Sequence, residues 1–449
     1  MIQAELVGDR LTEEKIAEFV TTHRVSRFLD NEKYYNGENP TIMKRVLPNV
    51  NAPNYKLPVS YARKIVRTVV GYMYKPGLIT YNVEDEVYKA ALDEIFLLNN
   101  ENTKTSAMGR QSSIQGVGYE LHYTAGGAVP YFAKVPVANM IVVYDYAIEP
   151  DIIAAIRHYR ANREGQEVEV YYSDRVDYFF LSDKSVNKKL VAEGSEPHEY
   201  EQVPVVVYEN NEEQIGDFEP IKPLIDAYDV LLSDSMNEFD RFAWAYLILK
   251  NMTTTDQDAR EVKYKKIIEL FDDGDAKFLQ KDIPSDYIQF MSEWIRKEIH
   301  KQSHVPDFTD TTLGTEMTGA AIDRLFYDFE FIAANKEDRF RDALKKRIEL
   351  VNVIIRKGSL KSAAVEADDI EIIMDRNKPQ MLKELGETAQ FYSGLVSDET
   401  LIEQFAPFTD AETEEERKGN EEDPYRSEDG NEGYGEKQQE DNKDSRQAD

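Results

Sequence analysis

The stretch TGAAIDRLFYDFEFIAANKEDRFRDALKKRIELVNVIIRK, residues 318–357, decides the fold of this chain. It contains no proline, and its one glycine, Gly319, stands near the start. Thr318 suits a helix N-cap, and Lys357 followed by Gly358 suits a helix end. At about 1.5 Å per residue the helix would be roughly 60 Å long and would cross a whole subunit. Its apolar residues recur three or four positions apart, which is the helical period: Ile322, Leu325, Phe326, Phe329, Ile332, Ala333, Phe340, Leu344, Ile348, Val351 and Ile355.

Length and composition predict a large folded chain of several substructures. With 449 residues the chain is too long for one compact core, and we expect about two to four substructures. Its 41% hydrophobic and 11% aromatic content can fill real cores. The absence of cysteine excludes disulfides, thiolate zinc sites and cysteine nucleophiles, and favours the cytosol as the place of folding. No signal-peptide pattern and no run of 18 apolar residues stands out, so we expect neither secretion nor a membrane-spanning segment.

The charge balance constrains any role with nucleic acid. The chain carries 54 basic and 85 acidic residues, a formal net charge of -31. A protein that wraps DNA binds it by neutralising phosphates with lysine and arginine. An acidic surface repels DNA instead, so the composition argues against a wrapping protein.

The first 220 residues predict an α+β region. Residues 117–208 have the period of strands, with Gly126-Gly127 as a hairpin signal, and predict an antiparallel sheet. A basic helix face formed by Arg63, Lys64 and Arg67 could contact a partner, although a solvated face is the more common meaning of such a pattern. The expected helices span 12–29, 59–74, 83–98 and 106–116, and the expected strands 119–123, 131–135, 140–146, 152–160, 167–172, 176–181 and 203–208.

The second half alternates long helices with a small insert. A polar linker, residues 210–217, precedes a helix at 221–244. The insert follows, and a helix at 285–302 leads through a loop at 303–317 into the long helix. Within the insert we expect a strand at 245–250, a helix at 256–270 and a strand at 276–280.

The sequence predicts no enzyme and no cofactor. His300 and His304 have a helical spacing that suits a metal, but Lys301 stands where a zinc protease would have a glutamate. Gly116-Val-Gly118 precedes a strand and lacks a third glycine, so it is no nucleotide-binding loop. Carboxylates are too numerous for the sequence to single out a catalytic pair.

The order of elements and several short stretches resemble portal proteins of tailed bacteriophages, in the branch found in long non-contractile-tailed phages of Gram-positive hosts. Together these stretches span residues 34–400, and their order and spacing carry the resemblance. One departure lies in the loop before the long helix, where many members have a Phe-Gly-Gly step and this chain reads TLGTEMTG at 312–319. The stretches are YYNG (34–37), IMKR (42–45), VGYMYKP (70–76), VPVVVYENN (203–211), GDFE (216–219), LIDAYDVLLSD (224–234), VPDFTD (305–310), DRNKP (375–379) and SGLVSDET (393–400).

The resemblance implies a portal-like subunit with an α/β wing, long stem helices, a small α/β clip, a long spine helix and a helical crown. Apolar stripes on three long helices offer the two different surfaces that a head-to-tail ring needs. The implied segments are the wing (1–220), a stem helix (221–250), the clip (251–284), a second stem helix (285–302), the tunnel loop (303–317), the spine helix of the wing (318–369), a return strand with the crown (370–416) and an acidic tail (417–449), which its composition predicts to be disordered.

The resemblance also implies the function and the partners. We expect a ring, usually of twelve copies, assembled in the host cytoplasm and placed at one capsid vertex of the virion, with double-stranded DNA passing through its tunnel. The expected partners are the terminase large subunit, the major capsid and scaffolding proteins, and a head-tail adaptor, with no membrane. The expected site residues are Asp307, Thr309, Asp310, Thr311, Thr312 and Thr315 in the tunnel loop facing DNA, Lys297 and Lys301 on the tunnel side of the stem, and Tyr264, Lys265 and Lys266 in the clip facing the motor or adaptor.

Two other classes of protein remain as alternatives. An acidic cytosolic binding protein, such as a DNA mimic, would explain the charge but not the insert between two long helices. A hydrolytic enzyme would need a site that the sequence does not contain. Mass measurement of the purified protein separates these readings, because only a portal protein forms a ring of about a dozen copies.

Overall fold

The computed structural model divides the chain into two compact units, residues 1–378 and 379–449. Among the described residues of the second unit, the longest element is α11 (Leu382–Tyr392). The predicted disordered tail and the predicted helix at 256–270 lie outside the described residues. The structure describes residues 2–48, 52–125, 129–161, 163–184, 189–243, 246–250, 275–279, 285–308, 319–357, 365–378, 382–397 and 400–402, with residues 414 and 417.

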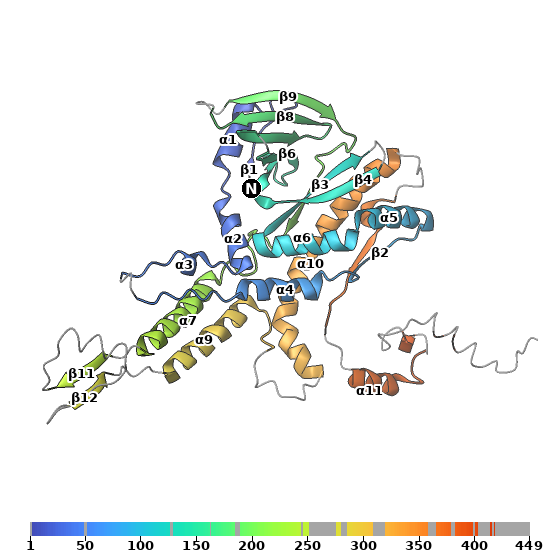
Figure 1. The fold of residues 1–449 in the computed structure, drawn as a ribbon. Coiled ribbons are helices and arrows are strands. Elements are labelled where there is room, and N and C mark those ends of the chain that lie inside the picture. Colours follow the sequence, from blue (N-terminus) through green and yellow to red (C-terminus); the bar gives the residue numbers. More distant parts are fainter. Residues whose placement is uncertain are drawn as a thin grey trace, which may run out of the picture. The chain divides into compact units, whose positions relative to one another are not determined.

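A six-stranded sheet forms one layer of the first unit, with the strand order β1-β5-β6-β7-β8-β9 (Figure 1). β1 pairs in parallel with β5, and the other neighbours are antiparallel. Helix α1 (Glu13–Thr22) buries Ile16, Phe19 and Val20 in the core of this sheet. The strands are β1 (Ile2–Gln3), β5 (Met140–Tyr144), β6 (Ile152–Tyr159), β7 (Gly165–Tyr171), β8 (Arg175–Ser182) and β9 (Leu190–Pro197).

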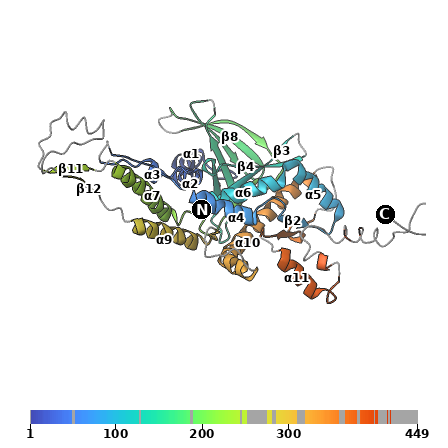
Figure 2. The same ribbon diagram turned by 60° about the horizontal axis from the view of Figure 1, so that its bottom comes forward.

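A second sheet of three strands has the order β10-β3-β4. The predicted hairpin is confirmed, because β3 and β4 pair on either side of the glycine pair. Helices α6 and α10 pack against this sheet, and α5 packs against β4 (Figure 2). The elements are α5 (Glu86–Asn99), α6 (Glu101–Gln115), β3 (Val117–Ala125), β4 (Val129–Val135) and β10 (Val205–Glu209).

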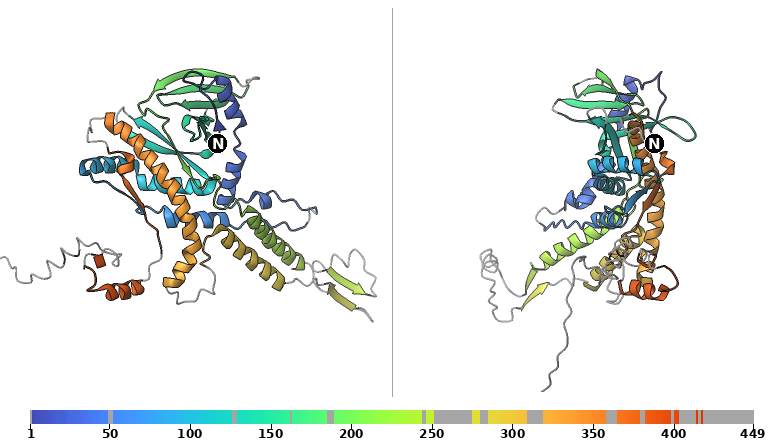
Figure 3. Two further views of the ribbon diagram at one scale, coloured as in Figure 1. Left: turned by 180° about the vertical axis from the view of Figure 1, so that it is seen from behind. Right: turned by 90° about the vertical axis from the view of Figure 1, so that its right-hand side faces the viewer.

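The predicted long helix is confirmed as α10 (Gly319–Lys357). It runs past the three-stranded sheet, where it contacts β4 and β10, and Phe329 packs on Tyr72 of α4 (Figure 3). A short two-stranded sheet of β2 and β13 lies after α4. The remaining elements of this part are α2 (Ser26–Asn36), α3 (Pro40–Met43), α4 (Tyr61–Met73), β2 (Ile79–Asn82), η1 (Val137–Asn139), η2 (Ala367–Asp369) and β13 (Glu371–Met374).

Helices α7 (Lys222–Ala243) and α9 (Ser285–Ser303) lie side by side, as all views show. Between them in the chain stands a pair of antiparallel strands, β11 (Tyr246–Lys250) and β12 (Asp275–Leu279). The predicted helix, the two predicted strands of the insert, the second helix and the long helix are therefore confirmed in their predicted order.

The extended segment before α4 binds to α7 through a ladder of hydrogen bonds. The Val59 N–H donates to Asp229 Oδ1 at 2.8 Å. The Leu57 N–H donates to Ser233 Oγ at 3.1 Å, and the Tyr55 N–H to Asn237 Oδ1 at 2.8 Å. Four helical residues advance about 6 Å and two extended residues about 6.6 Å, so every second amide meets the next acceptor along the helix. Side chains of α7 thus supply partners for backbone N–H groups that have no strand beside them.

A buried arginine joins α10 to the three-stranded sheet and to α6. Arg347 is fully buried and makes a two-pronged contact with the Glu120 carboxylate, at 2.9 and 2.7 Å. Its Nη1 also donates to Glu101 Oε1 at 2.8 Å and to Thr105 Oγ1 at 2.6 Å. The Phe132 ring lies 4.6 Å from the guanidinium carbon. A buried charge persists only when it is paired and hydrogen-bonded, and Arg347 has both kinds of partner.

Several local predictions were wrong. The helix predicted at 12–29 is two helices, α1 and α2, because the chain leaves the helical conformation at His23 and restarts at Ser26. The single antiparallel sheet is two sheets, one with a parallel edge, and β2 and β9 were missed. The polar linker predicted at 210–217 is present, and it also packs on α10, because Lys336 donates to Asn210 Oδ1 and Asp217 Oδ1, both at 2.5 Å, in a buried site.

Replacing Arg347 by methionine should lower the free energy of unfolding by about 3–5 kcal/mol near pH 7, because Glu120 stays buried without its cation. Burial alone would raise the pKa of Glu120, but Arg347 and the hydrogen bond with His122 outweigh it and lower that pKa to about 2. This contribution is therefore present above the ordinary glutamate pKa of 4.5 and is lost as the pH falls towards 2. Denaturant unfolding curves recorded at several pH values are the measurement. The difference in the free energy of unfolding between the parent and Arg347→Met should become smaller in acid.

Arg356→Met is the matched control on the same helix. Arg356 is about half exposed and pairs with the exposed Glu366, so its loss should change the free energy of unfolding by less than about 1 kcal/mol. Equal effects of the two substitutions would contradict the role given to Arg347.

Candidate functional site

The candidate site is the base of the loop that leaves α9, the stretch predicted as a tunnel loop. α9 ends at Ser303, and His304 has a positive φ of 55°, the left-handed conformation that closes many helices. Val305 precedes Pro306, and a residue before proline avoids the helical region. The Ser303 hydroxyl donates to the His300 carbonyl oxygen at 3.2 Å and accepts from the Val305 N–H at 3.4 Å. The chain therefore turns sharply at the end of α9.

His300 fixes this turn from inside. Its Nδ1 lies 3.0 Å from the Val305 carbonyl oxygen, which can only accept, so Nδ1 carries a proton. Burial lowers the pKa of His300, so the ring is neutral near pH 7 and Nε2 is an acceptor. Lys64 of α4 donates to that Nε2 at 3.2 Å. One neutral tautomer thus links α4, α9 and the loop.

Asp307 brings the only carboxylate described in this turn. Its oxygens lie 3.5 Å from Lys64 Nζ and 3.7 Å from Arg296 Nε. The His300 Nε2 is also 3.7 Å away, but a neutral ring offers no proton there, so Lys64 and Arg296 supply the attraction. The Asp307 side chain is only 12% exposed. The base of the loop is thus tied to α4 and α9 by a cluster of Lys64, Arg296, His300 and Asp307, called here the loop-base cluster.

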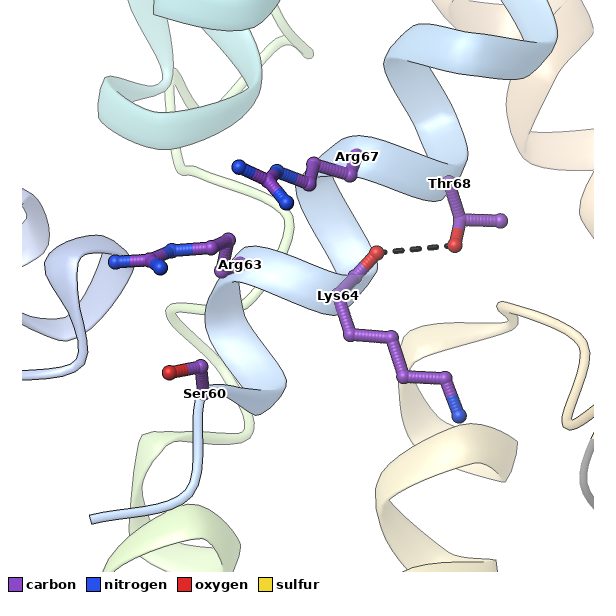
Figure 4. Close-up of a pocket in the computed structure, with 5 residues that line it drawn as sticks. All are labelled: Ser60, Arg63, Lys64, Arg67 and Thr68. Carbon is purple, nitrogen blue, oxygen red and sulfur yellow. Dashed lines mark hydrogen bonds between the residues drawn. The ribbon is translucent and has the colours of Figure 1, made fainter.

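The basic face of α4 lines a shallow hollow of about 440 Å³ (Figure 4). Arg63 and Lys64 leave the helix on different sides, and Thr68 donates to the Lys64 carbonyl oxygen at 2.9 Å. Arg63 donates to the Tyr35 and Asn36 carbonyl oxygens at 2.9 and 2.6 Å, and so caps the C-terminal end of α2. Only Arg67 is exposed. Two of the three basic residues that the sequence singled out therefore serve contacts within the chain.

An aromatic contact continues from the loop to α10. The Phe308 ring, 52% exposed, lies 5.7 Å from the Phe326 ring. Phe326 stacks on Tyr72 of α4 at 5.3 Å, and Phe329 lies beside both. The start of the loop and helix α10, which follows the loop in the chain, thus both contact α4.

The structure describes only part of the predicted site. Asp307 lies in the loop-base cluster, where cations of its own chain already engage it, and its contact with DNA stays a prediction. Lys297 and Lys301 are exposed on α9, and Lys301 lies 3.8 Å from Glu298. The other predicted residues lie outside the described part: Thr309, Asp310, Thr311, Thr312, Thr315, Tyr264, Lys265 and Lys266.

Sequence reasoning missed Lys64 and Arg296 as partners of Asp307, and the link from His300 to Lys64 and Val305. Lys64 is more than 200 positions away in the chain, and no spacing rule joins it to His300. In the part of the chain that the structure describes, no three His, Asp or Glu side chains converge as a metal site. None of the described helices is long and apolar enough to cross a membrane.

Comparison with known proteins gives the family. The sequence profile of the family described as "Phage portal protein, SPP1 Gp6-like" matches residues 18–426. The chain belongs to this family. The resemblance found in the sequence is thereby confirmed, and with it the expectation of a phage portal protein, a component of the virion at the capsid vertex.

Two relatives illustrate the match. The portal protein of Bacillus phage SPP1 is 28% identical over 226 residues, which are 47% of this chain and 45% of the relative, so this alignment spans about half of that protein. The portal protein of Clostridium phage phiCD119 is 23% identical over 374 residues, 75% of this chain and 82% of the relative. Both are proteins of phages, as the predicted branch requires.

A solved structure supports the fold. The neck of an empty gene transfer agent particle, computed with C6 symmetry, aligns with a TM-score of 0.50 at 12% identity, covering 86% of this chain and 94% of that chain. At this level of identity the likeness shows the fold alone. It agrees with the α+β architecture that the sequence predicted.

Replacing Asp307 by asparagine should loosen the loop base, because the loop would lose the carboxylate charge that attracts Lys64 and Arg296. We expect the free energy of unfolding to fall by about 1–2 kcal/mol and proteolysis between residues 303 and 318 to quicken severalfold. Peptide mapping by mass spectrometry measures the cleavage. Glu293→Gln, at an exposed position of α9, is the control, and equal protease sensitivity of both variants would contradict the anchoring role.

Proposed function

We propose that about a dozen copies of this chain form a ring at the capsid vertex, through which double-stranded DNA is packaged and later ejected. The family match over residues 18–426 carries this proposal. The net charge of -31 supports it. An acidic channel repels the DNA phosphates and lets the duplex slide, whereas basic residues that neutralise the phosphates would bind it tightly. The alternative, an acidic binding protein without a ring, has no comparable support, and no catalytic step is assigned to the chain.

Each segment of the chain would form a different part of the portal subunit. Helices α7 and α9 would form the stem, and residues 251–284 the clip, with Tyr264, Lys265 and Lys266 meeting the terminase large subunit and later the head-tail adaptor. The neighbouring pair α7 and α9, interrupted by the short hairpin β11–β12, supports this division. The wing, residues 1–220 with α10, would meet the major capsid and scaffolding proteins, and residues 370–416 would hold the return strand and crown.

The loop of residues 303–317 would contact the DNA. Thr309, Asp310, Thr311, Thr312 and Thr315 are short and polar, so they can touch the duplex without neutralising its phosphates. The loop-base cluster supports the proposal, because it holds the start of the loop against α4 and α9. The loop would then grip by shape and hold packaged DNA while sliding remains possible.

Ring formation is the direct test of the proposed function. The purified chain should give rings of about a dozen subunits in negative-stain images, with a mass to match by native mass spectrometry. Rings should also persist at moderate salt, because apolar contacts are insensitive to screening. A chain that stays monomeric at micromolar concentration, with and without scaffolding protein, would refute the proposal.

Deleting Thr309 to Thr312 should leave rings intact but reduce the DNA that capsids package or retain. The reason is that a shortened loop can no longer reach the duplex. Nuclease-protected DNA per particle is the measurement, and replacing the same four residues by Gly-Ser-Gly-Ser is the control that restores length. Parental packaging and retention by the deletion variant would rule out the role of the loop.

A further inference from the structure

The outer side of α9 carries an aromatic stripe that no described part of its own unit covers. Tyr287, Phe290 and Trp294 are 59%, 62% and 48% exposed. Their spacing of three and four residues places them on one side of the helix, and Lys297 and Lys301 continue the same side. These five residues are called the outer α9 stripe. Large exposed apolar residues gathered on one face mark an interaction surface.

The inner side of the same helix is already in use. Ile295 and Ile299 are buried, and α9 lies beside α7 (Figure 2). On a helix of 3.6 residues per turn, positions 295 and 299 lie about 120° and 160° from the middle of the stripe. The aromatic stripe is therefore not the buried side of α9, and its exposed rings offer a surface to a different partner.

Duplex DNA is a poor partner for this face. Aromatic side chains bind nucleic acid by stacking on unpaired bases, and the bases of a duplex are already stacked on each other. The outside of the duplex offers charged phosphates, against which three aromatic rings would be desolvated without compensation. A protein surface with aromatic residues and carboxylates fits better, because it suits both the rings and the two lysines.

The chain itself offers such a surface on α10. Tyr327 and Phe331 are 76% and 71% exposed and lie four residues apart. Asp328 stands beside them, is exposed, and has no cation partner among the residues that the structure describes. Lys297 likewise has no described carboxylate partner, and Lys301 has only the distant contact with Glu298. Tyr327, Asp328 and Phe331 are called the outer α10 stripe.

We propose that the outer α9 stripe of one copy packs against the outer α10 stripe of the next copy. This inference rests on the proposed ring and specifies its contact surface. A head-to-tail ring requires two different, complementary surfaces on each subunit, and the two stripes match in aromatic character and in opposite charge. Lys297 and Lys301 then face the neighbouring copy, where Asp328 can pair with them, and do not line the tunnel as the sequence suggested.

Two double variants test the contact in the full chain. Phe290→Ser with Trp294→Ser removes the aromatic part, and Lys297→Glu with Lys301→Glu reverses the charges. Each should reduce the yield of rings at least tenfold in mass photometry, while circular dichroism and melting temperature stay close to the parent. The controls are Leu97→Ser, at an 81% exposed position of α5, and Lys184→Glu, on an exposed turn after β8, and both should form rings as the parent does.

A compensating change tests the partner face. Adding Asp328→Lys to the Lys297→Glu, Lys301→Glu variant should restore a substantial part of the ring yield, because the charges are then exchanged across the contact. Asp328→Lys alone should lower the yield. Failure of the combined variant to recover, with all variants folded, would overturn the pairing of the two stripes.

Tryptophan fluorescence gives a reading that does not depend on disruptive variants. The chain has two tryptophans, Trp244 and Trp294, so Trp244→Phe leaves Trp294 as the single reporter. Its emission should shift to shorter wavelength when monomers assemble into rings, because the indole leaves water. An unchanged emission in assembled rings would contradict the proposal.

The outcomes separate this inference from the proposed function. If the lysine variant forms rings in parental yield but packages DNA abnormally, the lysines line the tunnel, the inference is overturned and the portal function stands. If the parent chain itself never forms rings, the proposed function fails, and the contact between copies fails with it.

Discussion

The pairing of Arg347 with Glu120 and Glu101 is the constraint on which the rest of the structure depends. It places one charged group of the long helix α10 against a strand of the three-stranded sheet and against α6. Because three charges are buried together, α10 cannot rotate or slide without leaving one of them unpaired in a dry environment. Lys336, held by Asn210 and Asp217, fixes the same helix a few turns earlier. The orientation of α10 then determines which side chains, including Tyr327 and Phe331, face outward.

The long helices and the β3–β4 hairpin could be predicted from the sequence, because each depends on a pattern within one continuous stretch. The helix α10, the pair α7 and α9, and the β3–β4 hairpin each have a repeated pattern or a turn signal in one stretch. The predictions that were wrong concern features that depend on contacts between residues distant in the sequence. Strand β9 was missed because seven of its eight residues, from Val191 to Pro197, are exposed, so it has no alternating apolar pattern. The division into two sheets is likewise set by packing partners and not by strand patterns.

The candidate site was predictable only in outline. The sequence identified a polar loop between two helices, and the family resemblance gave it a role, but neither indicated that Asp307 turns back towards Lys64 and Arg296. The contact with Lys64 joins positions more than 200 residues apart, and a single sequence contains no rule for such pairs. The same limit applies to Lys297 and Lys301. The family resemblance placed them on the tunnel side of the stem, whereas the exposed aromatic residues on the same side of α9 are the basis for proposing a protein partner.

The ladder between α7 and residues 55–59 has a mechanical consequence. Its three acceptors, Asp229, Ser233 and Asn237, match the repeat of an extended chain, so a shift of one residue would turn every amide away from its acceptor. The segment therefore has a single register and behaves as a rigid tie along α7. The segment leads directly into α4, which contains Lys64 of the loop-base cluster. A tilt of α7 would therefore displace the start of α4. That displacement would reach the base of the loop through Lys64, independently of the turn at the end of α9.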